Sequence, residues 1–495
     1  MKFVDSLAAF FDTNDMKFPK LVSSPWMWLF TAGCFVFLAV TGCTKKADST
    51  APSPKLSPED AKQQRLAWNL KTTVEAYDKV GDGNSAWDEP ARRALTEFAR
   101  VRAQSTESDE PWGQIIATNC NAAIAAGCRD GMISYLHARC SLDSQISSKE
   151  VADEYCKAAI ALKESSYPAV RKFYASRRAV QQVYSAYGTN ADQGTIHEVG
   201  GGLMDLVMET INDKTMPPAE VYDVCDEGLA AYKGNKDLYE RLYRDIEKKL
   251  FENWPNESVT WLLKGEGYVE LAWKTRGTGY ANTVTEEGWK LYRERLAVAE
   301  EALNRAWDLN PKDINIPLEF LTLELGQGQG RDRMELWFQR AMAIDPKCYD
   351  ACYKKLFYLE PKWYGSAEEM LAFGRECVES KDWAGHVPLI LLDAHLALRR
   401  YLDKSVQDDY WKQPGVWPDI KAAFDRFLEL NPEAIGWRHN YTLYAYHCEQ
   451  WDALNELIPK LGPINYEFFG GKDEFDKMVR LAKEYSSKSK TAEQN

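Results

Sequence analysis

Two stretches of the sequence repeat one helical pattern and decide the fold: AEEALNRAWDLNP, residues 299–311, and MELWFQRAMAIDP, residues 334–346. In each stretch the first residue is followed by apolar residues four and then seven positions later, and a proline closes the stretch. This spacing places the apolar residues on one side of an α-helix that ends before the proline. Pro311 and Pro346 lie about 35 residues apart, close to the period of roughly 34 residues of helix-turn-helix solenoids.

Trp261, Gly265 and Tyr268 precede the first stretch at a spacing that resembles the first helix of tetratricopeptide repeats (TPRs). The next unit departs from this pattern, with leucines between residues 318 and 325 in its place, so the repeat boundaries stay open. The resemblance implies an all-α fold, a TPR-like helical-hairpin solenoid whose first helices line an inner groove. A groove of this kind binds a peptide or a helix of a partner protein.

The composition is that of a folded, acidic protein. The chain has 495 residues, of which 45% are hydrophobic and 27% charged, enough for two or three domains. The formal net charge is -13. We therefore expect no nucleic acid among the partners, since its phosphates require a basic surface.

Residues 1–42 are predicted to be a signal peptide. A short basic head, Met16–Lys20, precedes the apolar core Trp26–Val40, which is shorter than the ~20 residues needed to span a membrane. Aspartates occupy the region before Met16, so translation starting at Met16 is the interpretation we favour.

The sequence Val40-Thr41-Gly42-Cys43 resembles the lipobox of bacterial lipoproteins. The resemblance implies cleavage after Gly42, a lipid on Cys43 and an exported, membrane-anchored protein. Thr44, in place of an aspartate, favours the outer membrane if the source is diderm, facing the periplasm or the exterior. A spanning helix is the alternative.

The rest of the chain divides by composition and periodicity. The predicted parts are a flexible tether at 43–56, an N-terminal all-α region at 57–255, a TPR-like repeat region at 256–485 and a disordered tail at 486–495. Ser57, followed by Pro58, is predicted to cap the first helix of the body, and Ser147 with Glu150 has the spacing of a capping box.

Two long insertions interrupt the predicted helix pairs, one from Trp273 to Trp289 and one from Asp403 to Pro418. Both carry aromatic side chains, and loops on rigid scaffolds commonly bind ligands. The alternative is that these side chains only pack the loops onto the helices. The candidate binding residues are Trp273, Arg276, Tyr280, Trp289, Tyr410, Trp411 and Trp417.

No motif predicts catalysis, a cofactor or a metal. The glycine-rich stretch 326–331 follows a predicted helix and lacks the Lys-Ser/Thr ending of a P-loop, so we interpret it as a turn. Eleven cysteines are present; removal of Cys34 with the signal peptide and lipidation of Cys43 leaves an odd number. Most of these lie among apolar residues, where a small buried side chain is the usual role.

These observations favour a lipid-anchored envelope scaffold that binds a protein or peptide partner through a TPR-like groove. The first alternative is a glycan-binding lipoprotein, because the SusD-like family also combines TPR helices, a lipid anchor and exposed aromatic side chains. The second is an enzyme whose site the motifs do not reveal. Exposure of Trp273, Tyr280, Trp411 and Trp417 on one surface would favour the glycan alternative.

Overall fold

The computed structural model describes residues 57–80, 83–104, 111–141, 146–277 and 281–492. Across these ranges the regular elements are all helices, with no strand, which confirms the predicted all-α class. The predicted signal peptide, Cys43, the tether and Tyr280 lie outside the described residues. In the same ranges, no helix combines the length and the apolarity that crossing a membrane requires.

The α-helices in the N-terminal half are α2 (Pro58–Thr72), α3 (Val74–Val80), α4 (Asp88–Arg102), α5 (Trp112–Ala125), α6 (Gly131–Cys140), α7 (Ser148–Glu164), α8 (Ala169–Tyr187), α9 (Gln193–Gly200), α10 (Leu203–Thr210), α11 (Pro218–Ala230) and α12 (Lys236–Asn253). Those in the C-terminal half are α13 (Ser258–Arg276), α14 (Glu286–Leu309), α15 (Asn315–Gln327), α16 (Arg331–Ile344), α17 (Tyr349–Tyr358), α18 (Ala367–Glu379), α19 (Ile390–Arg400), α20 (Val416–Leu430), α21 (Trp437–His447), α22 (Trp451–Leu457) and α23 (Lys472–Ala492). The last helix thus continues into the segment 486–495, for which the sequence predicts disorder.

Short 3-10 helices occupy several of the connections: η1 (Gly188–Asn190), η2 (Ala281–Thr283), η3 (Val387–Leu389), η4 (Lys404–Val406), η5 (Asp409–Lys412), η6 (Ile458–Lys460) and η7 (Glu467–Phe469).

The predicted helix starts are confirmed. The Ser57 side chain accepts a hydrogen bond from the Asp60 backbone N–H, 3.1 Å away. Ser147 and Glu150 form the reciprocal capping box, in which each side chain accepts a hydrogen bond from the other residue's backbone N–H. The glycine-rich stretch is a turn: α15 ends at Gln327, and Gly328 and Gly330 have positive φ before α16 begins.

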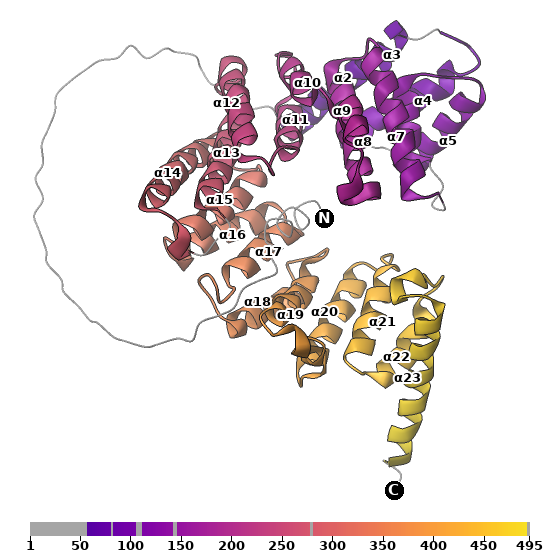
Figure 1. Cartoon of the computed structure of the whole chain (residues 1–495), viewed down its shortest axis with the longest axis vertical. Coiled ribbons are helices and arrows are strands. Elements are labelled where there is room, and N and C mark those ends of the chain that lie inside the picture. The colour runs from indigo at the N-terminus through magenta and orange to yellow at the C-terminus, as the bar shows by residue number, and fades with distance from the viewer. Residues whose placement is uncertain (1–56, 81–82, 105–110, 142–145, 278–280, 493–495) are drawn as a thin grey trace, which may run out of the picture.

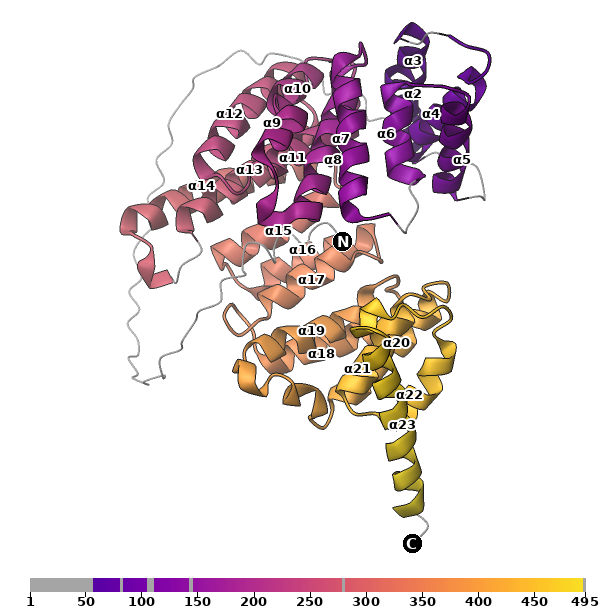
Figure 2. The same cartoon turned by 45° about the vertical axis from the view of Figure 1, so that its right-hand side comes forward.

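Helices that are neighbours in sequence pack against each other along the chain (Figure 1). A second set of contacts joins alternate helices, because α11 packs on α13, α13 on α15, α15 on α17 and α17 on α19. We call these five helices the odd-helix row. The pattern is consistent with a repeat. Alternate helices also pack nearer the N-terminus, where α2 contacts α4, α4 contacts α6 and α8 contacts α10. In Figure 2, α13 to α17 again lie between the N-terminal helices and the C-terminal helices.

The apolar face predicted from the opening stretches is the centre of the largest core. Ala299, Leu303 and Ala306 on α14 are buried in one cluster with Phe338 and Ala341 on α16. Removing such side chains from water is the main stabilising contribution in a helical stack.

A buried network of charges holds the first helix against the middle of the chain. Arg65 on α2 and Arg102 on α4 each bind both Glu220 and Asp223 on α11, at N···O distances of 2.7 to 3.0 Å. Burial alone would raise the pKa of the Glu220 carboxyl group, but the two guanidinium groups lower it to about 2. Arg171 on α8 extends the network through a 2.7 Å hydrogen bond to the Asn69 side chain.

The cysteines of the described chain are free thiols, and all except the half-buried Cys140 are buried. Burial raises the pKa of Cys120 and of Cys448 to about 12, so these thiols stay protonated at neutral pH.

Candidate functional site

The first insertion brings three of the predicted binding residues together. Trp273 and Arg276 stand on the last turn of α13, and Trp289 stands on the first turn of α14. The turn between α17 and α18 adds Trp363, whose ring centroid lies 5.9 Å from that of Trp273 at an interplanar angle of 88°. All four side chains are half-buried. The cluster therefore lies where two helix pairs turn, at an edge of the stack.

Arg276 lies in the middle of this cluster. Its guanidinium carbon is 5.7 Å from the ring centroid of Trp273, 5.9 Å from that of Trp289 and 6.0 Å from that of Trp363. Each distance is within the range in which the negative face of an aromatic ring attracts a cation. We call the three indoles with Arg276 the tryptophan cage.

Some polar atoms of the cage region have no hydrogen-bond partner. The indole nitrogens of Trp273 and Trp363 are buried without one. Unpaired buried donors are uncommon and cost free energy, so they point to a further partner.

The second insertion has the opposite character. Tyr410 and Trp411 on η5 are buried, with 7% and 5% of their surface exposed. Trp417, on the first turn of α20, is half-buried and stacks on Tyr441 at 5.9 Å between ring centroids. These three side chains are part of the packing between α19, α20 and α21.

A polar network fixes the second insertion from inside. The buried His395 ring on α19 lies 2.8 Å from the Tyr410 hydroxyl and 3.1 Å from Asp419 Oδ2. Because a carboxylate only accepts, His395 Nε2–H donates to Asp419 and Nδ1 accepts from Tyr410. Arg375 donates two hydrogen bonds to Asp419 at 3.0 and 2.8 Å. Burial favours the neutral acid, yet His395 and Arg375 lower the pKa of Asp419.

The described aromatic candidates do not form one exposed surface. Trp273 and Trp289 pack against the core of α13 to α19, whereas Trp417 packs against the two C-terminal cores, and Trp411 is buried. The arrangement that would have favoured a sugar platform is therefore absent from these side chains.

A set of charged residues on the odd-helix row was missed by the sequence analysis. The set comprises Asp226, Lys233, Glu266, Glu270, Lys274, Glu319 and Lys354, and we call it the carboxylate–lysine cluster. Direct contacts join parts of it: the Tyr222 hydroxyl donates to Glu266 at 2.8 Å, and Lys274 pairs with Glu270 at 3.0 Å. Lys354 on α17 donates to the Thr322 hydroxyl on α15.

Several charged groups of this cluster lie close together and are shielded from solvent on most sides. Burial, together with the negative charges of Glu319 and Asp226, raises the pKa of Glu266 well above its ordinary value. Burial also raises the pKa of Glu319 to about 7, against the attraction of Lys354 and Lys233. Both glutamates nevertheless keep part of their surface in solvent. Protein thus surrounds these carboxyl groups on most sides and leaves one side open, as in a binding site.

The sequence does contain a signal for this cluster. Glu319 lies between Leu318 and Phe320 on a largely apolar helix, whereas Glu266 lies on α13, which carries several other charges. A charge inside an apolar helix such as α15 predicts a specific partner or a site, but only the packing of four helices shows that the charges meet. Trp363 had no comparable signal, since it stands in a turn about 90 residues after Trp273.

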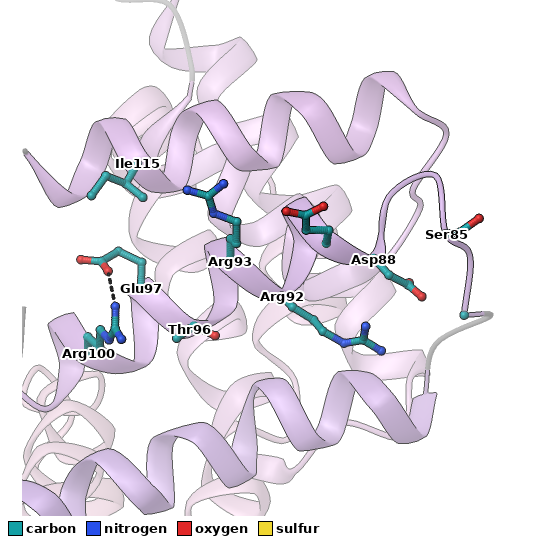
Figure 3. A pocket seen from close by; sticks show the side chains of 10 residues that line it. Ser85, Asp88, Arg92, Arg93, Thr96, Glu97, Arg100 and Ile115 are labelled. Atoms are coloured by element: carbon teal, nitrogen blue, oxygen red, sulfur yellow. Dashed lines mark ion pairs between the residues drawn. The ribbon is translucent and has the colours of Figure 1, made fainter. Parts of the chain in front are cut away.

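A separate cleft lies along α4 (Figure 3). It has a volume of about 1040 Å³ and is lined by Arg92, Arg93 and Arg100 together with the carboxyl groups of Asp88, Glu89 and Glu97. Arg92 is paired with Asp78, and Arg100 lies 3.7 Å from Glu97, an ion pair that Figure 3 marks. The charges balance, so the cleft selects neither an anion nor a cation.

In the described ranges, no group of three or more His, Cys, Asp or Glu side chains is arranged to hold a metal ion. Comparison with models of known protein families and with curated proteins finds no match for the chain.

Proposed function

We propose that the protein is a lipid-anchored scaffold of the cell envelope that binds a protein or peptide partner along the odd-helix row of a TPR-like solenoid. The observation that carries the proposal is the carboxylate–lysine cluster. Apart from Lys233, which lies in the turn after α11, its charged side chains come from successive helices of one row, and they are half-buried with a side open to solvent. An extended or helical peptide contacts several successive helices at once, which suits a site of this kind.

The solenoid part of the proposal has its support in the packing of alternate helices and in the 35-residue spacing of Pro311 and Pro346, about one repeat. In TPR-like stacks the first helices of the pairs form the inner face. α13, which carries Trp261, Gly265 and Tyr268, is such a first helix by its sequence, and it belongs to the odd-helix row.

The anchor is proposed from the resemblance of residues 40–43 to a lipobox. Replacement of Cys43 by serine should move the protein from the membrane fraction to the soluble fraction, because no other lipid site is proposed. Persistence of the Cys43→Ser protein in membranes after a high-salt wash would contradict the lipoprotein assignment.

Partner binding is tested by photo-cross-linking in the host cell. A benzophenone amino acid replaces Tyr353, half-buried on α17, or, as a control, Leu336, which is 44% exposed on α16 outside the row. We expect a protein adduct from position 353 and none from position 336. Equal adducts at the two positions, or none at position 353, would refute the proposal.

A matched pair of double variants assigns the adduct to the cluster. Glu266→Gln with Glu319→Gln replaces two ionisable side chains of the row, and Glu294→Gln with Glu301→Gln replaces two at exposed positions on α14. Since a raised pKa means that the fold tolerates these glutamates in the neutral form, the first variant should fold. It should lose the adduct, because an amide cannot ionise or pair with a cation of the partner. Loss of the adduct in both variants would show a net-charge effect. Binding of oligosaccharides without a protein adduct would favour the glycan alternative.

A further inference from the structure

We propose that the tryptophan cage is a receptor for the guanidinium group of an arginine side chain in the partner, and that Arg276 occupies it in the free protein. The inference rests on the proposed function for the nature of the partner. It adds a second point of recognition, at the edge of the stack, and a specific residue type that the partner must present.

The geometry of the cage suits a cation on several sides at once. Trp273 and Trp363 meet nearly at right angles, and Tyr292 stands edge-to-face to both Trp273 and Trp289, at 79° and 83°. Rings that meet edge-to-face enclose a space from different directions, whereas stacked rings offer only parallel faces. The guanidinium carbon within 6.0 Å of three ring centroids therefore lies inside a box.

The present occupant defines the chemistry of the ligand. A guanidinium group is planar and weakly hydrated, so it stacks on indole at a lower desolvation cost than an ammonium group. Arg276 is the last residue of α13, and Gly277 follows with a φ of +71°. A residue at a helix end beside a glycine can change its backbone conformation without disturbing the helix, which allows Arg276 to leave the box.

A second observation indicates that the box is incomplete with Arg276 alone. The buried indole N–H groups of Trp273 and Trp363 have no acceptor. A peptide brings a carbonyl beside each of its side chains. An arginine in a peptide therefore supplies the cation and an acceptor for these donors together, which Arg276 does not.

The test uses a small probe, so that it does not depend on the identity of the partner. N-acetyl-arginine amide is titrated into the purified full-length chain by calorimetry, with N-acetyl-citrulline amide as the neutral probe of the same shape. Arg276→Ala should bind the arginine probe at least tenfold more tightly than the unchanged protein, because the competing side chain is gone. The citrulline probe should not bind. Addition of Trp363→Ala should abolish the gain.

Arg340 provides the matched control, since its guanidinium carbon lies 4.8 Å from the Trp307 ring and 4.3 Å from the Trp337 ring, with only two indoles and no box. Arg340→Ala should gain no affinity. If Arg276→Ala melts lower than the unchanged protein, the arginine probe should raise its Tm and the citrulline probe should not. No gain and no such rescue, or equal binding of both probes, would overturn the proposal. If the arginine-probe titration fails but the adduct from position 353 is still formed, only the cage proposal is overturned and the scaffold proposal is retained.

Discussion

The two insertions have the same appearance in the sequence and opposite roles in the structure. Each is a long connection with several aromatic residues. The Trp273 to Trp289 insertion leaves its indoles half-buried around a cation, whereas the Asp403 to Pro418 insertion places Tyr410 and Trp411 in the core. The two insertions differ in the polar groups at their centres. His395 and Asp419 hold the second insertion from inside, and the first has a cation at its centre.

The comparison teaches that aromatic content does not tell a binding loop from a packed one. A buried hydroxyl or carboxylate requires a partner, and the loop that supplies this partner becomes part of the core. A loop whose rings surround a cation at the edge of the stack keeps part of its surface in solvent. Four measurements examine this distinction.

The largest effect should come from the core of the second insertion. Trp411→Ala removes a buried indole that packs on Tyr410 and Tyr444, at 5.5 and 5.1 Å between ring centroids. We expect a loss of about 3–5 kcal/mol in the free energy of unfolding, as for other buried aromatic side chains. Denaturant titration measures it. If Trp411→Ala lost less unfolding free energy than Trp289→Ala, the second insertion would not be the more tightly packed of the two.

Acid should loosen the second insertion before the first. The pKa of Asp419 is lowered in the folded state, so its contribution is complete above the unfolded value of about 4 and is lost as the pH falls through the folded value. The hydrogen bonds to this charged group are worth roughly 1.5–3 kcal/mol. Hydrogen exchange should show residues 403–418 opening first on acidification. In Asp419→Asn, these residues should exchange fast already at pH 7.

Loss of the Tyr410 hydroxyl should cost less. Tyr410→Phe keeps the ring but leaves buried His395 Nδ1 without its donor, at a cost of about 1–3 kcal/mol. Tyr184, which is 48% exposed, provides the control, since Tyr184→Phe removes the hydroxyl of an exposed side chain. Thermal melts compare the two. Equal Tm values for both variants would mean that the hydroxyl does not anchor the insertion.

The smallest effect on stability is expected in the first insertion. Trp289→Ala removes one half-buried wall of the tryptophan cage. Its cation–π contact with Arg276 is worth about 0.5–1 kcal/mol and its edge-to-face contact with Tyr292 about 0.5–1.5 kcal/mol. The Tm should fall less than in Trp411→Ala, while the affinity of Arg276→Ala for the arginine probe should fall when Trp289→Ala is added. A loss of stability close to that of Trp411→Ala would show that both insertions are core.

Much of the fold could be predicted because its determinants are local. The helical periodicity at Ala299, Leu303 and Ala306, the cap at Ser57 and the turn at Gly328 all depend on residues within a few positions of each other. The sites depend on distant residues. Trp363 joins Trp273, and Glu319 meets Glu266, only through the stacking of helix pairs, which periodicity in one helix does not encode.

The buried network of charges that joins α2 and α4 to α11 affects the order in which the helices can fold. Arg65 and Glu220 are separated by 155 positions in the sequence, so the first helix emerges from the ribosome well before its counter-ions. At about 5–20 residues per second, that delay is roughly 8–30 s, whereas a helix forms in about a microsecond. Until Pro218 and the residues after it arrive, three guanidinium groups on α2, α4 and α8 have no carboxylates from α11. The N-terminal helices can therefore complete their packing only as fast as the ribosome synthesises the chain through α11. A fragment that stops before α11 should not fold stably.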